Sequence, residues 1–342
     1  MELNERKRAI LSAIIRAYAE HGEPIGSKAL CDMLDFSVSS ATLRNEMSDL
    51  CELGYLEQPH TSAGRVPTVL GYKLYISDLM NRDTLSGDMK LIIDALLDGV
   101  SGEVGDITSR AGQILSELTG LPVITTSVMS EHDTVKKIEL VPMGRRSVLA
   151  ILITSKGLFK NRICRTSCDV NESFLQKFYS ICGTYIIGKP LSLVSPTYAQ
   201  QVIASAGEIS LMALIGDILD MLEEIKRSSL TLRGESNLFR CYSRDGEVQK
   251  AMELLSQKDV MLSLLSQVDA PVGVLFGDDT QISELRPATL VVARYSHDGH
   301  ELGKIGVIGP TRMSYDRVIP SLEYFASKMS KVISETLTDL EE

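Results

Sequence analysis

The sequence predicts an α+β protein, and the distribution of strand-like and helical segments carries this prediction. Residues 135–166 and 271–309 contain short apolar, β-branched runs separated by turn residues, which indicates strands. The residues between these two segments have the apolar spacing of helices instead. Because strands resume after this helical stretch, we expect one discontinuous α/β domain with a mostly helical domain inserted into it. The expected ranges are 89–168 and 269–342 for the discontinuous domain and 169–268 for the insertion.

The N-terminal residues predict a separate unit of three helices and two short strands. Asn4 is a suitable N-cap for a first helix that ends at Gly22, and Ser27 is a suitable N-cap for a short second helix. A third helix begins at Ser40, and two short strands then flank a polar loop. Three helices followed by a hairpin are the pattern of a winged helix-turn-helix. We expect this unit over residues 1–80 and a linker over residues 81–88.

The third helix has the pattern of a DNA recognition helix. Leu43, Met47 and Leu50 share one face, so helical geometry turns the polar residues between them outward. Arginine can pair bidentately with guanine and asparagine with adenine, and the first turns of a recognition helix reach the base edges. The candidate DNA-binding residues of this helix are Ser40, Ala41, Thr42, Arg44, Asn45 and Ser48.

The loop PHTSAGRVPT, residues 59–68, is expected to form the wing. It lacks the strand-to-helix elbow of a serine nucleophile, so a hydrolase that uses His60 and Ser62 is disfavoured and we expect no enzyme. It also lacks the lysine and the following helix of a phosphate-binding loop. Hydroxyl groups, a glycine and an arginine between two prolines instead suit a tip that contacts DNA. The candidate wing residues are His60, Thr61, Ser62, Gly64 and Arg65.

The charge balance argues against a general polyanion binder. The net charge is −10, and the first 80 residues contain eight Lys/Arg and eleven Asp/Glu. Any DNA contact must therefore come from a local arrangement of positive groups. Outside the third helix and the wing, the nearby candidates are Arg6, Lys7, Arg8, Lys28 and Lys73.

The composition is that of a soluble cytoplasmic protein. Its apolar runs, such as residues 148–154, are far shorter than the roughly 20 residues that span a bilayer. The N-terminus carries charges of both signs and has no apolar signal-peptide core. The six cysteines contain no C-x-x-C pair, which suits reduced thiols. We therefore expect a cytoplasmic protein without a membrane segment.

One helix within the expected insertion has an unusually wide apolar face. Its apolar residues alternate steps of four and three, as in a coiled-coil seam. The sequence leaves two interpretations open, a central core helix and a homodimer interface. The candidate dimerisation residues are Leu211, Ile215, Ile218, Leu222 and Ile225.

We expect no metal site and no cofactor. His297 and His300 flank a DG turn signal without a nearby third ligand, and Cys164 and Cys168 lack a partner pair. The glycines at 303, 306 and 309 do not have the G-x-G-x-x-G spacing of a dinucleotide site and do not open a helix.

Two long motifs resemble those of a known family. Residues 39–80, SSATLRNEMSDLCELGYLEQPHTSAGRVPTVLGYKLYISDLM, are similar to the signature region of the HrcA family of heat-inducible transcription repressors. Residues 303–319, GKIGVIGPTRMSYDRVI, resemble the second hallmark of that family. The similarity in layout extends over the whole chain, whereas individual base contacts are not carried over from the family.

The resemblance implies a dimeric repressor with a winged helix, a GAF-like domain and a dimerising domain inserted into it. It also implies binding to CIRCE, an inverted-repeat DNA operator upstream of chaperone operons, and an activity maintained by the GroEL chaperonin. An alternative hypothesis is a metabolite-responsive transcription regulator with an effector in the GAF-like domain.

Overall fold

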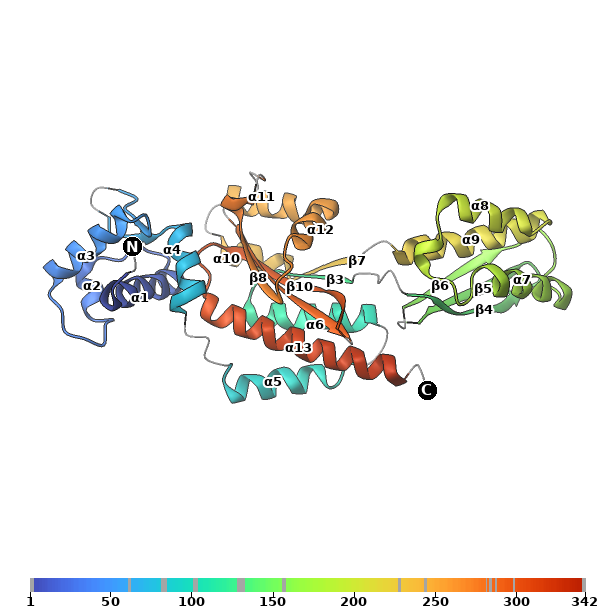
Figure 1. The fold of residues 1–342 in the computed structure, drawn as a ribbon, viewed down its shortest axis with the longest axis horizontal. Helices are drawn as coiled ribbons and strands as arrows, with labels where there is room; N and C mark the ends of the chain where they lie inside the picture. Colours follow the sequence, from blue (N-terminus) through green and yellow to red (C-terminus); the bar gives the residue numbers. More distant parts are fainter. Residues whose placement is uncertain are drawn as a thin grey trace.

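The computed structural model arranges the chain as a row of units, with an N-terminal unit and an outer unit at opposite ends of a central one (Figure 1). The N-terminal unit comprises residues 3–80, the outer unit residues 133–226, and the central unit residues 85–127 and 229–339. The structure describes residues 3–60, 63–80, 85–100, 104–127, 133–155, 158–226, 229–242, 245–280, 282, 285–286, 288–297 and 299–339.

The N-terminal unit is a winged helix-turn-helix, as the sequence predicts. Its elements are α1 (Glu5–His21), α2 (Ser27–Cys31), α3 (Ser40–Glu52), β1 (Leu56–Glu57), β2 (Val66–Pro67), α4 (Val69–Leu74) and the π-helical turn η1 (Tyr75–Leu79). Strands β1 and β2 are antiparallel, and a bridge between Ile25 and Arg65 extends this small sheet. Asn4 caps α1 and Gly22 ends it with a φ of 73°, in the left-handed region that glycine adopts readily.

The central unit is built around a five-stranded antiparallel sheet with the order β7-β3-β10-β9-β8. Its strands are β3 (Val123–Ser127), β7 (Ser229–Arg233), β8 (Val272–Phe276), β9 (Ala288–His297) and β10 (His300–Pro310). Its helices are α5 (Gly87–Leu97), α6 (Val104–Thr119), η3 (Glu235–Asn237), α10 (Leu238–Cys241), α11 (Asp245–Ser256), α12 (Lys258–Ser266), η4 (Gly277–Asp279) and α13 (Tyr315–Asp339).

Helices cover both faces of the central sheet. Along β9, Val291 and Ala293 join the core formed with α6 and α13, while Leu290 and Val292 join the core formed with α11 and α12. Successive strand residues point to opposite faces, so a strand buried on both faces reads as a continuous apolar run. This arrangement agrees with the GAF-like α/β domain that we expected.

The outer unit combines a three-stranded antiparallel sheet, β4-β5-β6, with three α-helices. Its elements are β4 (Val135–Gly144), β5 (Ser147–Thr154), β6 (Phe159–Arg165), α7 (Glu172–Tyr185), η2 (Leu191–Leu193), α8 (Pro196–Ser205) and α9 (Ile209–Lys226). Val148, Ala150 and Leu152 of β5 are fully buried in a core shared with these helices.

The expected domain boundaries need correction. Strands β4–β6 do not join β8–β10 in one sheet, so the insertion begins after β3 rather than at residue 169. It ends before β7, because β7 pairs with β3 and α10–α12 pack on the central sheet. The insertion is therefore not mostly helical but contains a sheet. Strand periodicity reveals which side chains are buried, whereas sheet membership depends on long-range pairing that this pattern does not encode.

The helix with the wide apolar face, α9, is a core helix of the outer unit. Leu211, Ile215, Ile218 and Leu222 are 0% exposed within a single chain, and Ile225 is half-buried against the same core. These side chains already pack beneath the sheet, so the four enclosed ones are not free to meet a partner. The interpretation of this seam as the dimer interface is corrected accordingly.

Candidate nucleic-acid interface

The turn between α2 and α3 is held by hydroxyl groups. Ser39 is the N-cap of α3, and its Oγ accepts a hydrogen bond from the amide of Thr42 at 3.1 Å. The hydroxyls of Ser27 and Ser40 lie 2.9 Å apart and join the two helices. Gly26, and not Ser27 as expected, is the N-cap of α2. Leu43, Met47 and Leu50 are buried, which confirms the inward face of α3.

The opposite face of α3 presents its polar residues to solvent. Ala41, Arg44, Asn45 and Ser48 are exposed, as the helical spacing predicts. Ser40 and Thr42 are half-buried, and their hydroxyls bond to Ser27 and Ser39. The structure therefore separates the six candidates into four that face outward and two that also hold the turn.

Ion pairs neutralise the carboxylates on the flank of α3. The Nζ of Lys7 lies 2.8 Å from a carboxylate oxygen of Asp49 and 3.1 Å from one of Glu46, and Arg6 lies 3.5 Å from Glu46. Hydrogen bonds to Asp49 and Glu46 raise the pKa of Lys7 above its ordinary value, so the ammonium stays charged. Arg44 makes no ion pair or hydrogen bond within the described part of the chain. Its charge therefore dominates the outer face of the helix.

The other candidate cations have different surroundings. Lys28 is exposed beside the turn. Arg8 donates to the carbonyl of Asp78 at 3.5 Å, and Lys73 pairs with Asp279 at 2.6 Å. Of these three, Lys28 is the cation that remains available on the side of α3.

The wing is anchored at its base. The amide and the carbonyl of Arg65 each bond to Ile25 at 2.9 Å, and the Nε of Arg65 is buried without a hydrogen-bond partner among the described residues. Arg65 therefore sits at the wing base and is half-buried, not at the tip as expected. His60 is exposed, while Thr61 and Ser62 lie outside the described residues.

Gly64 has a structural role at this base. A Cβ on Gly64 would lie 2.4 Å from the carbonyl carbon and oxygen of Ile25, a distance that real Cβ contacts do not show. The close approach of the two backbones thus requires glycine at this position. Its presence in the loop is explained by packing, without any contact to a ligand.

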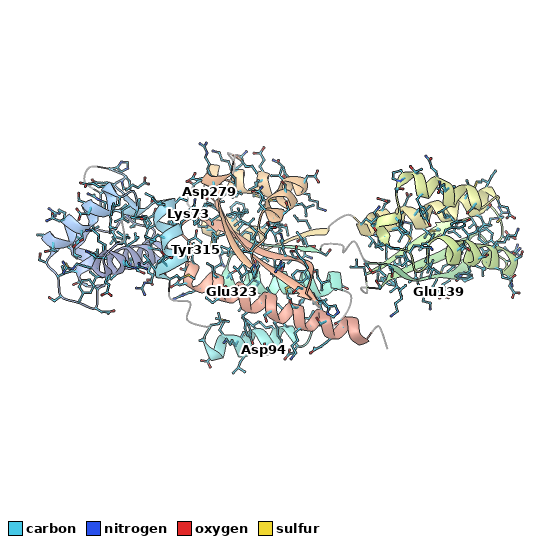
Figure 2. The ribbon with its side chains drawn as sticks, viewed as in Figure 1. Lys73, Asp94, Glu139, Asp279, Tyr315 and Glu323 are labelled. Carbon is cyan, nitrogen blue, oxygen red and sulfur yellow. The ribbon has the colours of Figure 1, made fainter. Side chains whose placement is uncertain are left out.

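A junction that the sequence did not predict connects this unit to the central one. Tyr72 of α4 packs against Tyr315 with ring centroids 5.5 Å apart, and Phe276 lies 6.1 Å from Tyr315. Figure 2 shows Lys73, Asp279 and Tyr315 where α4 meets the central unit. The sequence signal for this junction is the helical spacing of Tyr72 and Tyr75 after the N-cap Thr68, a pattern that does not specify what the two rings pack against.

Among the described residues, no group of three or more His, Cys, Asp or Glu side chains is placed to hold a metal ion. None of the helices in this part of the chain is long and apolar enough to cross a bilayer.

Comparisons with known proteins agree with this geometry. The family model described as winged helix-turn-helix transcription repressor, HrcA DNA-binding, matches residues 2–80. The model described as HrcA protein C terminal domain matches residues 105–319. The helix-turn-helix, its exposed α3 face and the hairpin wing define a winged-helix DNA-binding regulator.

The full-length relatives narrow this class to one family. The heat-inducible transcription repressor HrcA of Clostridium acetobutylicum is 33% identical over 324 residues, which cover 93% of this chain and 94% of the relative. That of Clostridioides difficile is 32% identical over 336 residues and covers 95% and 98%. The chain belongs to the HrcA family.

A solved structure has the same fold. The crystal structure of a hypothetical protein at 2.2 Å resolution superimposes with a TM-score of 0.73 at 21% identity. The match covers 98% of this chain and 100% of that chain, so the likeness includes all three units.

Proposed function

We propose that this protein is a heat-inducible transcription repressor that binds double-stranded DNA through its N-terminal unit. One observation carries the proposal: the exposed face of α3 presents Arg44 and Asn45, while Lys7 neutralises the carboxylates on its flank. The N-terminal unit is acidic overall, but the carboxylates beside α3 are paired whereas the charge of Arg44 is not. The phosphate backbone of DNA is therefore attracted to this face in spite of the acidic composition.

The recognition helix would enter the major groove with its N-terminal half. Arg44 and Asn45 are suited to guanine and adenine, and each bidentate pair contributes about 1–3 kcal/mol of discrimination. Ala41 and Ser48 flank them on the same exposed face. The hydroxyls of Ser40 and Thr42 lie at the start of the helix, where phosphate contacts position the protein.

The wing would contact the adjacent DNA backbone. His60 is exposed at the start of the loop, and Thr61 and Ser62 follow it in the sequence. Arg65 contributes its positive charge from the wing base, and Gly64 allows the base to lie against Ile25.

We place the homodimer interface on the open face of the outer sheet. The residues of β5 alternate with its buried ones, so Leu149 and Ile151 point away from the helices. Val141 and Ile163 pair with Leu149 on the two neighbouring strands and are 40% and 66% exposed. Among the described elements none covers this apolar row across three strands, which suits a second copy of the same sheet.

Figure 2 gives the direction of this face. Glu139, whose Cα pairs with that of Ile151, lies on the side of the outer unit away from α8. The outer unit that carries this face lies at the far end of the molecule from the DNA-binding unit (Figure 1). Two chains joined there would form a two-fold dimer, the symmetry that an inverted repeat requires.

The proposed operator is the CIRCE inverted repeat, and the proposed activator of the repressor is the GroEL chaperonin. Family membership supports both proposals. A repressor that depends on a chaperonin links the transcription of chaperone operons to the load of unfolded protein, because a loss of about 1–2 kcal/mol in stability can change the functional fraction severalfold.

A gel shift tests this function. The full chain is mixed with a CIRCE duplex or with a duplex of the same composition in which both half-sites are scrambled, at one stated salt concentration. We expect the protein to shift the CIRCE duplex and not the scrambled duplex. Incubation of the protein with chaperonin and ATP should increase the shifted fraction of the CIRCE duplex. Equal shifts of both duplexes would contradict the proposed operator, and an unchanged shifted fraction would contradict the chaperonin dependence.

A further inference from the structure

A cavity lies between the DNA-binding unit and the central unit, directly behind the base of the wing. Its volume is about 380 Å³, within the range of about 300–1,000 Å³ that small-molecule sites occupy. The N-terminal unit contributes Glu57 of β1 and Tyr72 of α4, and the central unit contributes Tyr242, Glu247 and Arg312. The cavity does not lie in the core of the GAF-like domain, where helices close both faces of the sheet.

Two hydroxyl groups in this cavity lack partners. Tyr72 and Tyr242 are 1% and 6% exposed, and their hydroxyl oxygens have no hydrogen-bond partner among the described residues. Leaving a buried hydroxyl without a hydrogen-bond partner is destabilising, so two beside one cavity require an explanation. Burial raises the pKa of both phenols well above the ordinary value, so each keeps its proton at neutral pH and can donate.

A positive charge lies beside these donors. Arg312 lines the cavity and makes no ion pair or hydrogen bond within the described residues. Its guanidinium is near enough to Gly22 that a Cβ there would lie 2.9 Å from Nη1, so the arginine of the central unit abuts the end of α1. The field of Arg312 lowers the pKa of Tyr72 against the larger effect of burial.

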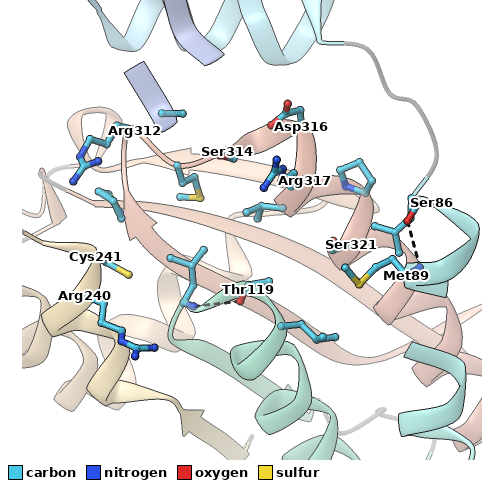
Figure 3. Close-up of a pocket in the computed structure, with 18 residues that line it drawn as sticks. Ser86, Met89, Thr119, Arg240, Cys241, Arg312, Ser314, Asp316, Arg317 and Ser321 are labelled. Carbon is cyan, nitrogen blue, oxygen red and sulfur yellow. Dashed lines mark hydrogen bonds between the residues drawn. The ribbon is translucent and has the colours of Figure 1, made fainter. Parts of the chain in front are cut away.

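Arg312 also connects this cavity with a larger neighbour. The second cavity has a volume of about 640 Å³ and shares Cys241, Pro310 and Arg312 with the first. Figure 3 shows Arg312 at one end of the larger cavity and Ser86 and Met89 at the other. Both cavities therefore border the side chain of Arg312.

We propose that the smaller cavity binds a small metabolite with a carboxylate or phosphate group at one end and a hydroxyl or amine at the other. The oxyanion accepts hydrogen bonds from Tyr72, Tyr242 and Arg312, whose donor groups have no acceptor among the residues that the structure describes. The hydroxyl or amine faces the carboxylates of Glu57 and Glu247. A molecule held there touches the wing base and the central unit together, so its concentration would influence how the DNA-binding unit is held.

The thermal stability of the full chain without DNA tests the proposal. The probes are inorganic phosphate, glycerol 3-phosphate as a phosphate monoester, and malate as a hydroxycarboxylate, each at millimolar concentration and constant ionic strength. We expect the monoester or malate to raise Tm in a concentration-dependent manner. A shift with the monoester and phosphate assigns a phosphate site, and a shift with malate alone assigns a carboxylate site. If none of the three probes raises Tm, the proposal is overturned.

Variants locate the binding. Tyr72→Phe removes an unpaired hydroxyl, so the Tm without probe should stay level or rise, while the Kd should rise about three- to tenfold. Arg312→Gln removes a charged donor and should raise the Kd about ten- to a hundredfold. Tyr198→Phe, in the outer unit where its hydroxyl donates to the carbonyl of Tyr185, is the matched control and should leave the Kd unchanged.

A Kd that is the same in wild type, Tyr72→Phe and Arg312→Gln would place the binding elsewhere and refute the proposal. Because the measurement uses no DNA, its failure would leave the proposed DNA binding intact.

Discussion

Gly64 and Ile25 show how single residues fix the wing. The backbone of the wing base lies so close to Ile25 that a methyl group on Gly64 would overlap its carbonyl. Gly26 directly follows Ile25 in the sequence. It has no atom within 4 Å of its ideal Cβ and adopts a φ of −88°, which residues other than glycine also adopt. The two glycines therefore differ in what they contribute, although both belong to the same small sheet region.

Replacing Gly64 with alanine should destabilise the N-terminal unit. The added methyl must displace the strand, which costs about 1–3 kcal/mol as overpacking does elsewhere. Gly26→Ala is the matched control and should change the stability by less than about 1 kcal/mol. Chemical denaturation of both variants measures the difference. Equal stabilities of the two variants would show that the wing base tolerates a side chain.

At the scale of elements, the outer sheet has one face that is enclosed and one that is open. Helix α9 covers Val148, Ala150 and Leu152 with residues that are themselves fully buried. The open face carries the row Val141, Leu149 and Ile163. The sequence identified α9 as unusually apolar but left its partner open, because a wide apolar helix face looks the same whether a sheet of its own chain or a second chain covers it.

A substitution on the open face should break the dimer without unfolding the chain. Ile163→Glu places a charge on the most exposed residue of the proposed apolar row and should convert the dimer to a monomer. Ile209→Glu is the matched control, because Ile209 is 81% exposed at the start of α9 and does not lie on the sheet. Light scattering after size exclusion gives the two masses. A dimeric Ile163→Glu variant with native helix content would exclude this interface.

The elements of the DNA-binding unit were the most predictable part of the chain. Leu43, Met47 and Leu50 define the buried face of α3 from spacing alone, and caps and glycines mark the helix ends. The ion pairs of Lys7 and the position of Arg65 could not be predicted in this way, because they depend on how separate segments of the chain approach each other. The sequence also did not reveal that β4–β6 form their own sheet, because local patterns do not specify pairing across the chain.

At the scale of the whole molecule, the junction between α4 and the central unit determines how the DNA-binding unit is held. Tyr72, Tyr315 and Phe276 form a buried aromatic cluster, and Lys73 and Asp279 pair beside it. Aromatic pairs contribute about 0.5–1.5 kcal/mol beyond the area they bury, whereas an exposed ion pair contributes about 0–1 kcal/mol. The aromatic cluster should therefore dominate the coupling between the two units.

Tyr315→Ala should loosen the N-terminal unit from the central one. We expect faster amide hydrogen exchange in α4 and in β1–β2, because these elements lose their support on the central unit. Tyr295→Ala is the matched control, since Tyr295 is equally buried but bonds to the carbonyl of Thr126 within the central sheet. Its effect should be confined to the central unit. Unchanged exchange in α4 of Tyr315→Ala would mean that the units are coupled by other contacts.

Recognition of DNA by the exposed face of α3 can be measured by equilibrium titration of a labelled CIRCE duplex, followed by fluorescence anisotropy. Arg44→Ala should raise the Kd about five- to a hundredfold, the equivalent of about 1–3 kcal/mol, and should reduce the preference over a scrambled duplex. Arg110→Ala, which removes an exposed arginine of the central unit, should leave the Kd within about twofold. A wild-type Kd and an unchanged sequence preference in Arg44→Ala would show that this face of α3 does not recognise DNA.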